Sequence, residues 1–128
     1  MAVVELNQSG FEAAIEENNF VIVDFWAPWC GPCRSFAPVY EKVSADFDDI
    51  LFAKVNTEDE QEIAAHFRIR SIPTLMIFRD QTIIYAQPGA MPEGAFRELL
   101  TKARELDMAE VKRQEAERRD ASQASGNA

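Results

Sequence analysis

Several residue types are scarce in this 128-residue chain, and each scarcity excludes a class of function. Two cysteines and one histidine, His66, cannot by themselves supply the four Cys or His ligands of a structural zinc site. No apolar stretch is long enough to cross a bilayer. Basic residues number 13 against 22 acidic ones, so the formal net charge is -9. Such a chain should repel nucleic acids and anionic membranes, and we expect neither as a partner.

The N-terminal sequence also lacks the features of a secretory signal. Residues 1–19 have no basic region followed by an apolar core and a small-residue cleavage site. The expectation is therefore a cytoplasmic protein in a reducing compartment. In that setting a lone cysteine pair indicates catalysis, redox sensing or metal binding more often than a structural disulfide.

What the sequence does have is the composition of one globular domain, with 47% hydrophobic and 27% charged residues. Two runs are apolar almost throughout, which is typical of strands buried on both faces. Strands and helices alternate, and a hairpin and a last helix follow. This order predicts an α/β fold with a central mixed sheet flanked by helices on both faces. The predicted strands are 20–26, 50–56, 74–78 and 82–86, and the predicted helices are 10–17, a segment from the cysteines to about 48, 57–67 and one after Pro92.

Local signals place the ends of these elements. Capping-box patterns at residues 9–12 and 57–60 predict two helix starts. Pro38 should kink the helix that follows the cysteines, and Pro92 should occupy the first turn of the last helix. The apolar face of that last helix is predicted to contain Phe96, Leu99, Leu100, Ala103 and Leu106.

The sequence changes character after Leu106, which divides the chain into a domain at 1–106 and an extension at 107–128. The extension begins with mixed charges and few large apolar residues, and Glu115 and Arg119 have the i,i+4 spacing of an exposed helix. Residues 121–128 are small and polar, which predicts a disordered tail. The extension is interpreted as a solvated helix, with a partner-docking helix as the alternative.

The two cysteines lie in Cys30-Gly31-Pro32-Cys33, between a predicted strand and a predicted helix. Thiol–disulfide exchange needs a thiolate that attacks a disulfide and a second thiol that resolves the mixed disulfide. A helix N-terminus stabilises a thiolate at Cys30, and Cys33 in the first turn can reach it. Cys33 should be the more buried thiol. A structural disulfide and accidental spacing are the remaining alternatives, and so short a loop would gain little stability from a crosslink.

The stretch "VDFWAPWCGPC", followed some forty residues later by "IPT", closely resembles the thioredoxin family. The resemblance runs from Val3 to Leu106. It implies a thioredoxin-like fold and a protein-disulfide reductase. It also implies no bound cofactor beyond the redox-active Cys30–Cys33 disulfide, and no metal. The implied partners are disulfide-containing proteins and an NADPH-dependent thioredoxin reductase, and a monomer is the default oligomeric state.

The resemblance assigns a role to each matching residue. Cys30 matches the exposed nucleophile and Cys33 the buried resolving thiol. Trp29 matches the aromatic residue beside the site. Asp24 matches a buried acid whose raised pKa lets it help deprotonate Cys33, and Lys54 matches a lysine that modulates that acid. The alternative for Asp24 is a structural acid that only binds nearby backbone.

The substrate groove is implied in the same way. Pro73 matches the family's cis-proline, which would leave the backbone of Ile72 free to pair with an extended substrate. Gly89 and Ala90 match a small-residue loop that completes the groove. The pair Gly31-Pro32 lines the site and is typical of members that reduce disulfides rather than form them.

This chain also departs from the family's pattern. The hairpin has Asp80-Gln81 in place of a glycine turn, which predicts a strained or longer turn. Ser71 stands where glycine often precedes "IPT", and Pro88 precedes Gly89. These changes affect the substrate rim, and together with the extension they keep a second hypothesis open: a redox-regulated chaperone-like or adaptor module on the same fold.

Overall fold

A five-stranded sheet lies between two layers of helices in the computed structural model, which describes residues 3–126 and, beyond residue 121, the backbone alone. The strand order is β1-β3-β2-β4-β5. The first three of these strands are parallel, and β4 and β5 run antiparallel to their neighbours. The mixed sheet expected from the sequence is therefore confirmed. The strands are β1 (Val4–Glu5), β2 (Phe20–Trp26), β3 (Leu51–Asn56), β4 (Thr74–Arg79) and β5 (Thr82–Pro88).

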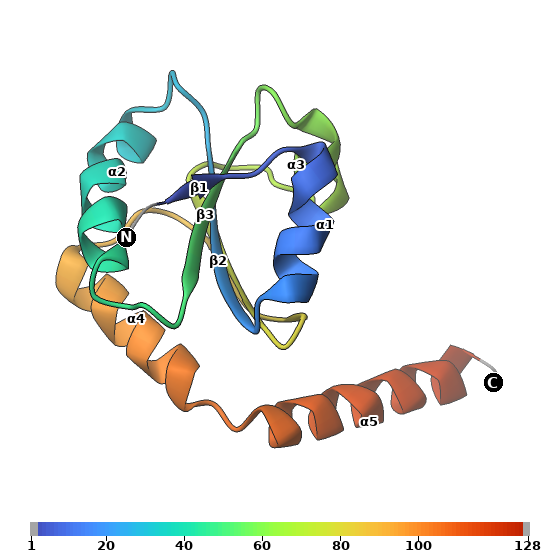
Figure 1. The fold of residues 1–128 in the computed structure, drawn as a ribbon. Helices are drawn as coiled ribbons and strands as arrows, with labels where there is room; N and C mark the ends of the chain where they lie inside the picture. The colour runs from blue at the N-terminus through green and yellow to red at the C-terminus, as the bar shows by residue number, and fades with distance from the viewer. Residues whose placement is uncertain (1–2, 127–128) are drawn as a thin grey trace.

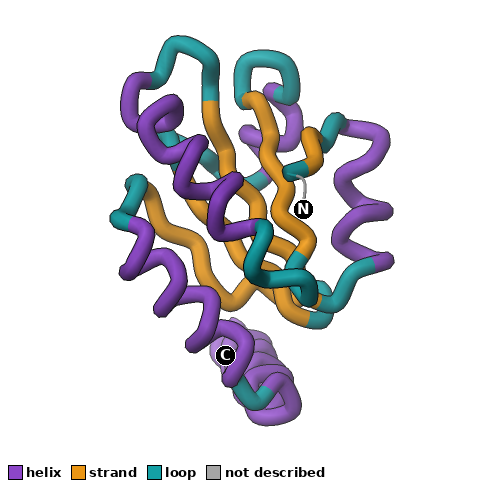
Figure 2. Tube along the Cα trace, turned by 60° about the vertical axis from the view of Figure 1, so that its left-hand side comes forward, coloured by secondary structure: helices purple, strands orange, loops and turns teal. Residues whose placement is uncertain are grey.

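Helices cover both faces of this sheet, as the two views show (Figure 1, Figure 2). One face is covered by α1 (Gln8–Glu17) and α3 (Gln61–His66), and the other by α2 (Gly31–Ser44) and α4 (Glu93–Glu105). The last helix, α5 (Met108–Gly126), leaves the domain after α4 and runs beneath it in Figure 1.

Both predicted capping boxes are wrong about where their helix begins. Helix α1 begins at Gln8 because the side chain of Asn7 accepts the Gly10 N–H at 2.9 Å, so Asn7 rather than Ser9 is the cap. Helix α3 begins at Gln61. Thr57 instead binds the end of β2, since its N–H and its hydroxyl both donate to the Trp26 carbonyl, at 2.8 and 3.0 Å.

Other helix boundaries also differ from the sequence-based expectation. Helix α2 passes through Pro38 as one element and ends at Ser44, not near residue 48. Pro92 is the N-cap of α4 rather than a first-turn residue. Leu106 is 41% exposed and therefore does not belong to the buried face, whereas Phe96, Leu100 and Ala103 are buried as predicted.

The extension is helical for longer than expected. Helix α5 continues to Gly126, where a disordered tail had been predicted from residue 121, and residues 127–128 lie outside the described part. Its ion pairs also differ from the prediction. Among the side chains described for α5, Arg113 pairs with Glu110 and Glu117, and the expected Glu115–Arg119 pair is not formed.

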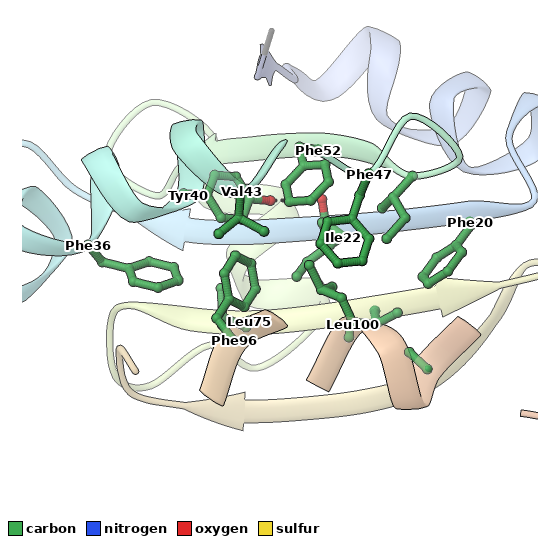
Figure 3. Packing of buried hydrophobic residues seen from close by; sticks show 13 residues of the cluster. Phe20, Ile22, Phe36, Tyr40, Val43, Phe47, Phe52, Leu75, Phe96 and Leu100 are labelled. Carbon is green, nitrogen blue, oxygen red and sulfur yellow. Dashed lines mark hydrogen bonds between the residues drawn. The ribbon is translucent and has the colours of Figure 1, made fainter. Parts of the chain in front are cut away.

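The core is divided by the sheet, and the alternation of β2 decides which side chain faces which layer. Phe20 and Ile22 join the cluster under α2 and α4, which also contains Tyr40 and Phe96 (Figure 3). The intervening residues Val21, Val23 and Phe25 join the cluster under α1 and α3. The same alternation places Asp24 on the α2 side of the sheet, beneath the helix that carries Cys33.

Candidate active site

Cys30 and Cys33 form a disulfide at the N-terminus of α2, with their Cα atoms 5.2 Å apart. Cys30 is the N-cap of this helix, and Gly31 and Pro32 are its first two residues. The missing N–H of Pro32 costs nothing there, because the first N–H groups of a helix have no intrahelical partner. The N–H of Cys33 donates to Sγ of Cys30 at 3.2 Å. A thiolate at Cys30 would therefore be stabilised by a directed N–H and by the positive end of a 14-residue helix.

The two cysteine residues are almost equally buried in this oxidised state, so the expected difference in exposure is small. Cys30 is 4% exposed and Cys33 is 3% exposed. Both pack with Ala27 in a small apolar cluster that Trp26 and Ile72 border. Trp29, directly before Cys30, is a large side chain that is 65% exposed.

One wall of the site is the segment that contains the cis Ile72–Pro73 bond, as the resemblance implied. The Ile72 carbonyl oxygen lies 3.7 Å from Sγ of Cys30. The Pro73 carbonyl accepts the Gly89 N–H at 2.7 Å, which brings the loop after β5 to the same wall. Gly89, far away in the sequence, is therefore held against the segment that borders Cys30.

The backbone conformation at Gly89 favours glycine. A Cβ built there would meet no atom of this chain within 4 Å, but the residue has a φ of +105°, which side chains rarely adopt. Ala90 lies beside it and lines a shallow groove with Ser35 and Met91. Pro88 is tolerated because β5 is an edge strand, where no further strand needs its N–H.

Asp24 is buried in the sheet and only 4% exposed. Its Oδ1 atom has no hydrogen-bond partner among the described residues. Burial raises the pKa of Asp24 from 3.8 to about 7, and the positive charge of Lys54 opposes part of that rise. The carboxyl can therefore exchange a proton near neutral pH. An unpaired oxygen does not fit the alternative of an acid that only satisfies nearby backbone.

Lys54 lies opposite Asp24 in the register of β2 and β3. Its Nζ atom lies 4.8 Å from the centre of the Trp26 ring and 3.9 Å from a carboxylate oxygen of Glu5. The ammonium group therefore acts on Asp24 as a neighbouring charge rather than as a hydrogen-bonded partner. Glu5 and the Trp26 ring hold it in this position.

Two residues of the site were not predicted from the sequence. The indole Nε1 of Trp29 donates to Glu58, a residue that the capping-box pattern had assigned to a helix start. Tyr40 lies under the site, and its hydroxyl lies 3.0 and 2.6 Å from the carbonyl oxygens of Ile22 and Ala53. Burial first, and then the charge of Asp24, raise the pKa of Tyr40 well above its ordinary value. No sequence signal pointed to either residue.

Two further kinds of site are absent from the described residues. No group of three or more His, Cys, Asp or Glu side chains there could hold a metal ion. No helix in that part of the chain is long and apolar enough to cross a membrane.

A family model and curated relatives all match this chain to one family. The family model for thioredoxin matches residues 2–102. The Streptomyces coelicolor protein named "Putative thioredoxin 2" is 50% identical over 116 residues, which are 91% of this chain and 87% of that protein. The thioredoxin of Bacillus subtilis is 38% identical over 103 residues, covering 80% of this chain and 98% of that one.

Solved structures agree in fold. The solution structure of the oxidised thioredoxin from Plasmodium falciparum superposes with a TM-score of 0.73 at 34% identity, covering 80% of this chain and 98% of that one. The match to the Streptomyces protein spans 116 residues, which is more than residues 1–106 contain. The similarity therefore continues into the extension.

Proposed function

Because this chain belongs to the thioredoxin family and is a thiol–disulfide oxidoreductase, we propose that it reduces protein disulfides, with Cys30 attacking and Cys33 resolving. The family acts on disulfide-containing proteins and is reduced in turn by thioredoxin reductase. The observation that carries the assignment of roles is the N–H of Cys33, which points at Sγ of Cys30 from the first turn of α2. An N–H donor and the N-terminus of a helix stabilise a thiolate at position 30, which supports Cys30 as the thiolate that attacks.

The reaction transfers two electrons in two exchanges. The Cys30 thiolate attacks one sulfur of the substrate disulfide, a Cys30–substrate disulfide forms, and the other substrate sulfur leaves as a thiolate that takes up a proton. Cys33 then loses its proton and attacks Sγ of Cys30. The Cys30–Cys33 disulfide forms, and the second substrate sulfur leaves as a thiolate. The substrate is reduced to a dithiol and this protein is oxidised.

Asp24 is proposed to accept the proton of Cys33 in the second exchange. Two features support this role for Asp24: its burial on the α2 side of the sheet and its pKa, which is raised to about 7. Lys54 is proposed to keep that pKa from rising further. Trp29, Gly31, Pro32, Ile72, Pro73, Gly89 and Ala90 are proposed to contact the substrate, with the backbone of Ile72 pairing with it strand to strand.

The proposal also covers the oligomeric state of the protein, its location and its re-reduction. We expect the protein to act as a monomer in the cytoplasm, where an NADPH-dependent reductase returns the disulfide to the dithiol. No bound cofactor is needed, since the electrons are carried by the two sulfurs.

The cysteine roles are tested by two matched substitutions. Cys30→Ser should abolish reduction of a protein disulfide, and Cys33→Ser should accumulate a covalent mixed disulfide because nothing resolves it. The measurement is turnover with a reductase, together with mass spectrometry of trapped complexes. Retention of full activity by Cys30→Ser would overturn the proposal.

A second candidate function is supported by α5. This helix continues to Gly126, beyond the residues that the family model matches, and the described side chains after Glu115 are exposed. An adaptor or chaperone-like role would use that surface independently of the cysteines. The extension is therefore tested separately, at the scale of the whole molecule.

A further inference from the structure

A groove of about 260 Å³ lies beside the cis-proline wall, lined in part by Ser71 and Thr74 on either side of residues 72–73. Residues 67–71 form one side of it, and the ends of β4 and β5 form the other, with Met76 and residues 86–88. We call it the arginine groove, because Arg68 and Arg70 both line it. It is a further recess, separate from the sulfur atoms.

Among the basic residues described up to Leu106, these two arginines differ from the others in having no partner. Both are exposed, and neither guanidinium has a hydrogen bond or ion pair to any side chain within residues 3–121. The other Lys and Arg residues of the domain each contact an acid, a carbonyl oxygen or an aromatic ring. In a chain with net charge -9, two free cations in one groove form a local site for an anion.

The backbone conformation at Arg68 favours glycine over a residue with a long side chain. Arg68 follows the C-cap Phe67 of α3 with a φ of +54°. The N–H groups of Arg68 and Ile69 donate to the carbonyls of Ala65 and Ala64, at 3.1 and 2.9 Å, which is the hydrogen-bond pattern of a Schellman cap. Glycine is the residue favoured at this position, because a side chain is strained in the left-handed region. The chain keeps a long cationic side chain where glycine would fit better.

The groove adjoins the surface proposed to hold the substrate. Arg70 is two residues from Ile72, whose carbonyl lies 3.7 Å from Sγ of Cys30, and two residues of extended chain span at most about 7 Å. The opposite side of the groove ends at Pro88, directly before Gly89. A peptide that pairs with Ile72 over the disulfide would therefore pass its neighbouring side chains along the arginine groove.

We propose that the arginine groove selects substrates with Asp or Glu side chains within about three residues of the attacked cysteine. This inference rests on the proposed function, because it concerns the same substrate strand. Carboxylates pair with guanidinium groups in a planar, bidentate geometry with two parallel hydrogen bonds. Two such pairs at the rim would direct one class of substrate to a molecule that otherwise repels acidic chains.

The test uses three peptides, each with one intrachain disulfide and with Glu, Gln or Lys at the positions that flank the cysteines. Their rates of reduction by dithiothreitol correct for the reactivity of each peptide. The wild-type protein should reduce the Glu peptide with a kcat/KM about fivefold above that of the Gln peptide, since each exposed pair contributes a factor of a few. The preference should largely disappear in about 0.5 M salt.

The decisive variant is Arg68→Gly with Arg70→Gln, and its matched control is Arg118→Gln with Arg119→Gln. Both change the net charge equally, and the control removes two exposed arginines of α5. The groove variant should lose the Glu preference, and the control should keep it. The glycine suits the backbone at position 68, so the groove variant's unfolding midpoint should not fall below that of the wild type.

The possible failures are distinguishable. Equal rates for the three peptides with the wild type, or a Glu preference that survives in the groove variant, would overturn the inference and leave the reductase assignment intact. A groove variant that slows the Gln peptide by the same factor would also overturn it, since the arginines would then support the site rather than select charge. Reduction of all three peptides by Cys30→Ser would instead contradict the proposed function.

Discussion

At the scale of single residues, Asp24 is the most informative position. It is neutral in the folded protein up to about pH 7, whereas the unfolded chain ionises it near its ordinary pKa of 3.8. Between these values the folded state holds one proton more than the unfolded state. Stability therefore falls as pH rises through this window, and the fall is complete above the folded pKa. A buried acid retained at this cost points to a chemical role.

Replacing Asp24 with asparagine should remove this pH dependence. The free energy of unfolding of Asp24→Asn relative to wild type should increase by about 2–3 kcal/mol between pH 5 and pH 8.5, because only the wild type gains a buried charge. Denaturant titrations of the oxidised proteins at both pH values measure this. Asp49→Asn is the control, because hydrogen bonding to Arg104 lowers the pKa of Asp49 and its ionisation is complete throughout that range.

The same variant separates a proton acceptor from a merely destabilising group. In the wild type, the rate at which Cys33 resolves a mixed disulfide should rise through about pH 7. In Asp24→Asn it should rise only towards the ordinary thiol pKa of about 8.5, with a loss of about tenfold or more at pH 7. Identical pH profiles for the two proteins would contradict the role given to Asp24.

At the scale of elements, the β4–β5 hairpin closes with two residues that suit its turn poorly. Asp80 and Gln81 have φ values of +51° and +67°, so the two-residue turn is formed without glycine. Contacts with residues outside the hairpin hold the turn in place. The Asp80 N–H donates to the Asn19 carbonyl at 2.8 Å, the Gln81 amide donates to the Glu16 carbonyl at 3.3 Å, and Lys112 lies 3.4 Å from the Asp80 carboxylate.

Gln81→Gly should therefore stabilise the protein by about 0.5 kcal/mol. Relief of the left-handed side chain, worth about 1–2 kcal/mol, exceeds the added flexibility of the unfolded chain and the loss of one exposed hydrogen bond. Thermal unfolding measures the change. Gln87→Gly in the same hairpin is the control and should destabilise, because its strand conformation favours a side chain. Loss of stability in Gln81→Gly would mean that its amide contributes more than the strain costs.

At the scale of the whole molecule, the attachment of α5 to the rest of the structure bears on the role of the extension. Helix α5 is joined to the domain by its first turns, through the burial of Met108 and the ion pair between Lys112 and Asp80. The loop between β2 and α2, where the disulfide lies, is at the end of the sheet away from α5 (Figure 1). The catalytic site therefore does not depend on contacts with the extension.

Removal of residues 107–128 should leave disulfide reduction within about twofold of wild type and lower the free energy of unfolding by about 1–2 kcal/mol, mostly from Met108. Steady-state reduction assays and denaturant titrations measure the two effects. The chaperone-like alternative also predicts an activity that does not need the cysteines. A Cys30→Ser, Cys33→Ser variant should suppress aggregation of a client only while it keeps these residues. A truncated protein with unchanged suppression would exclude a role for α5 in that function.

The sequence by itself determined the features that depend on short-range chemistry. The apolar run at 20–26 and the Cys30–Cys33 spacing specified a buried strand and a redox pair, because strand burial and the reach of two thiols involve few residues. The resemblance then supplied the cis bond at Pro73. The sequence could not determine helix starts, since the patterns at Ser9 and Thr57 were overridden by Asn7 and by the Trp26 carbonyl.

Only the tertiary structure decided which distant groups meet. The pKa of Asp24 depends on burial between β3, β4 and α2. The position of Lys54 depends on the register of two strands, and the contact of Trp29 with Glu58 joins two loops. The groove that Arg68 and Arg70 line together with residues of β4 and β5 likewise arises from chain packing. Burial and electrostatic interaction depend on distances in space, and those distances exist only once the sheet has brought its strands together.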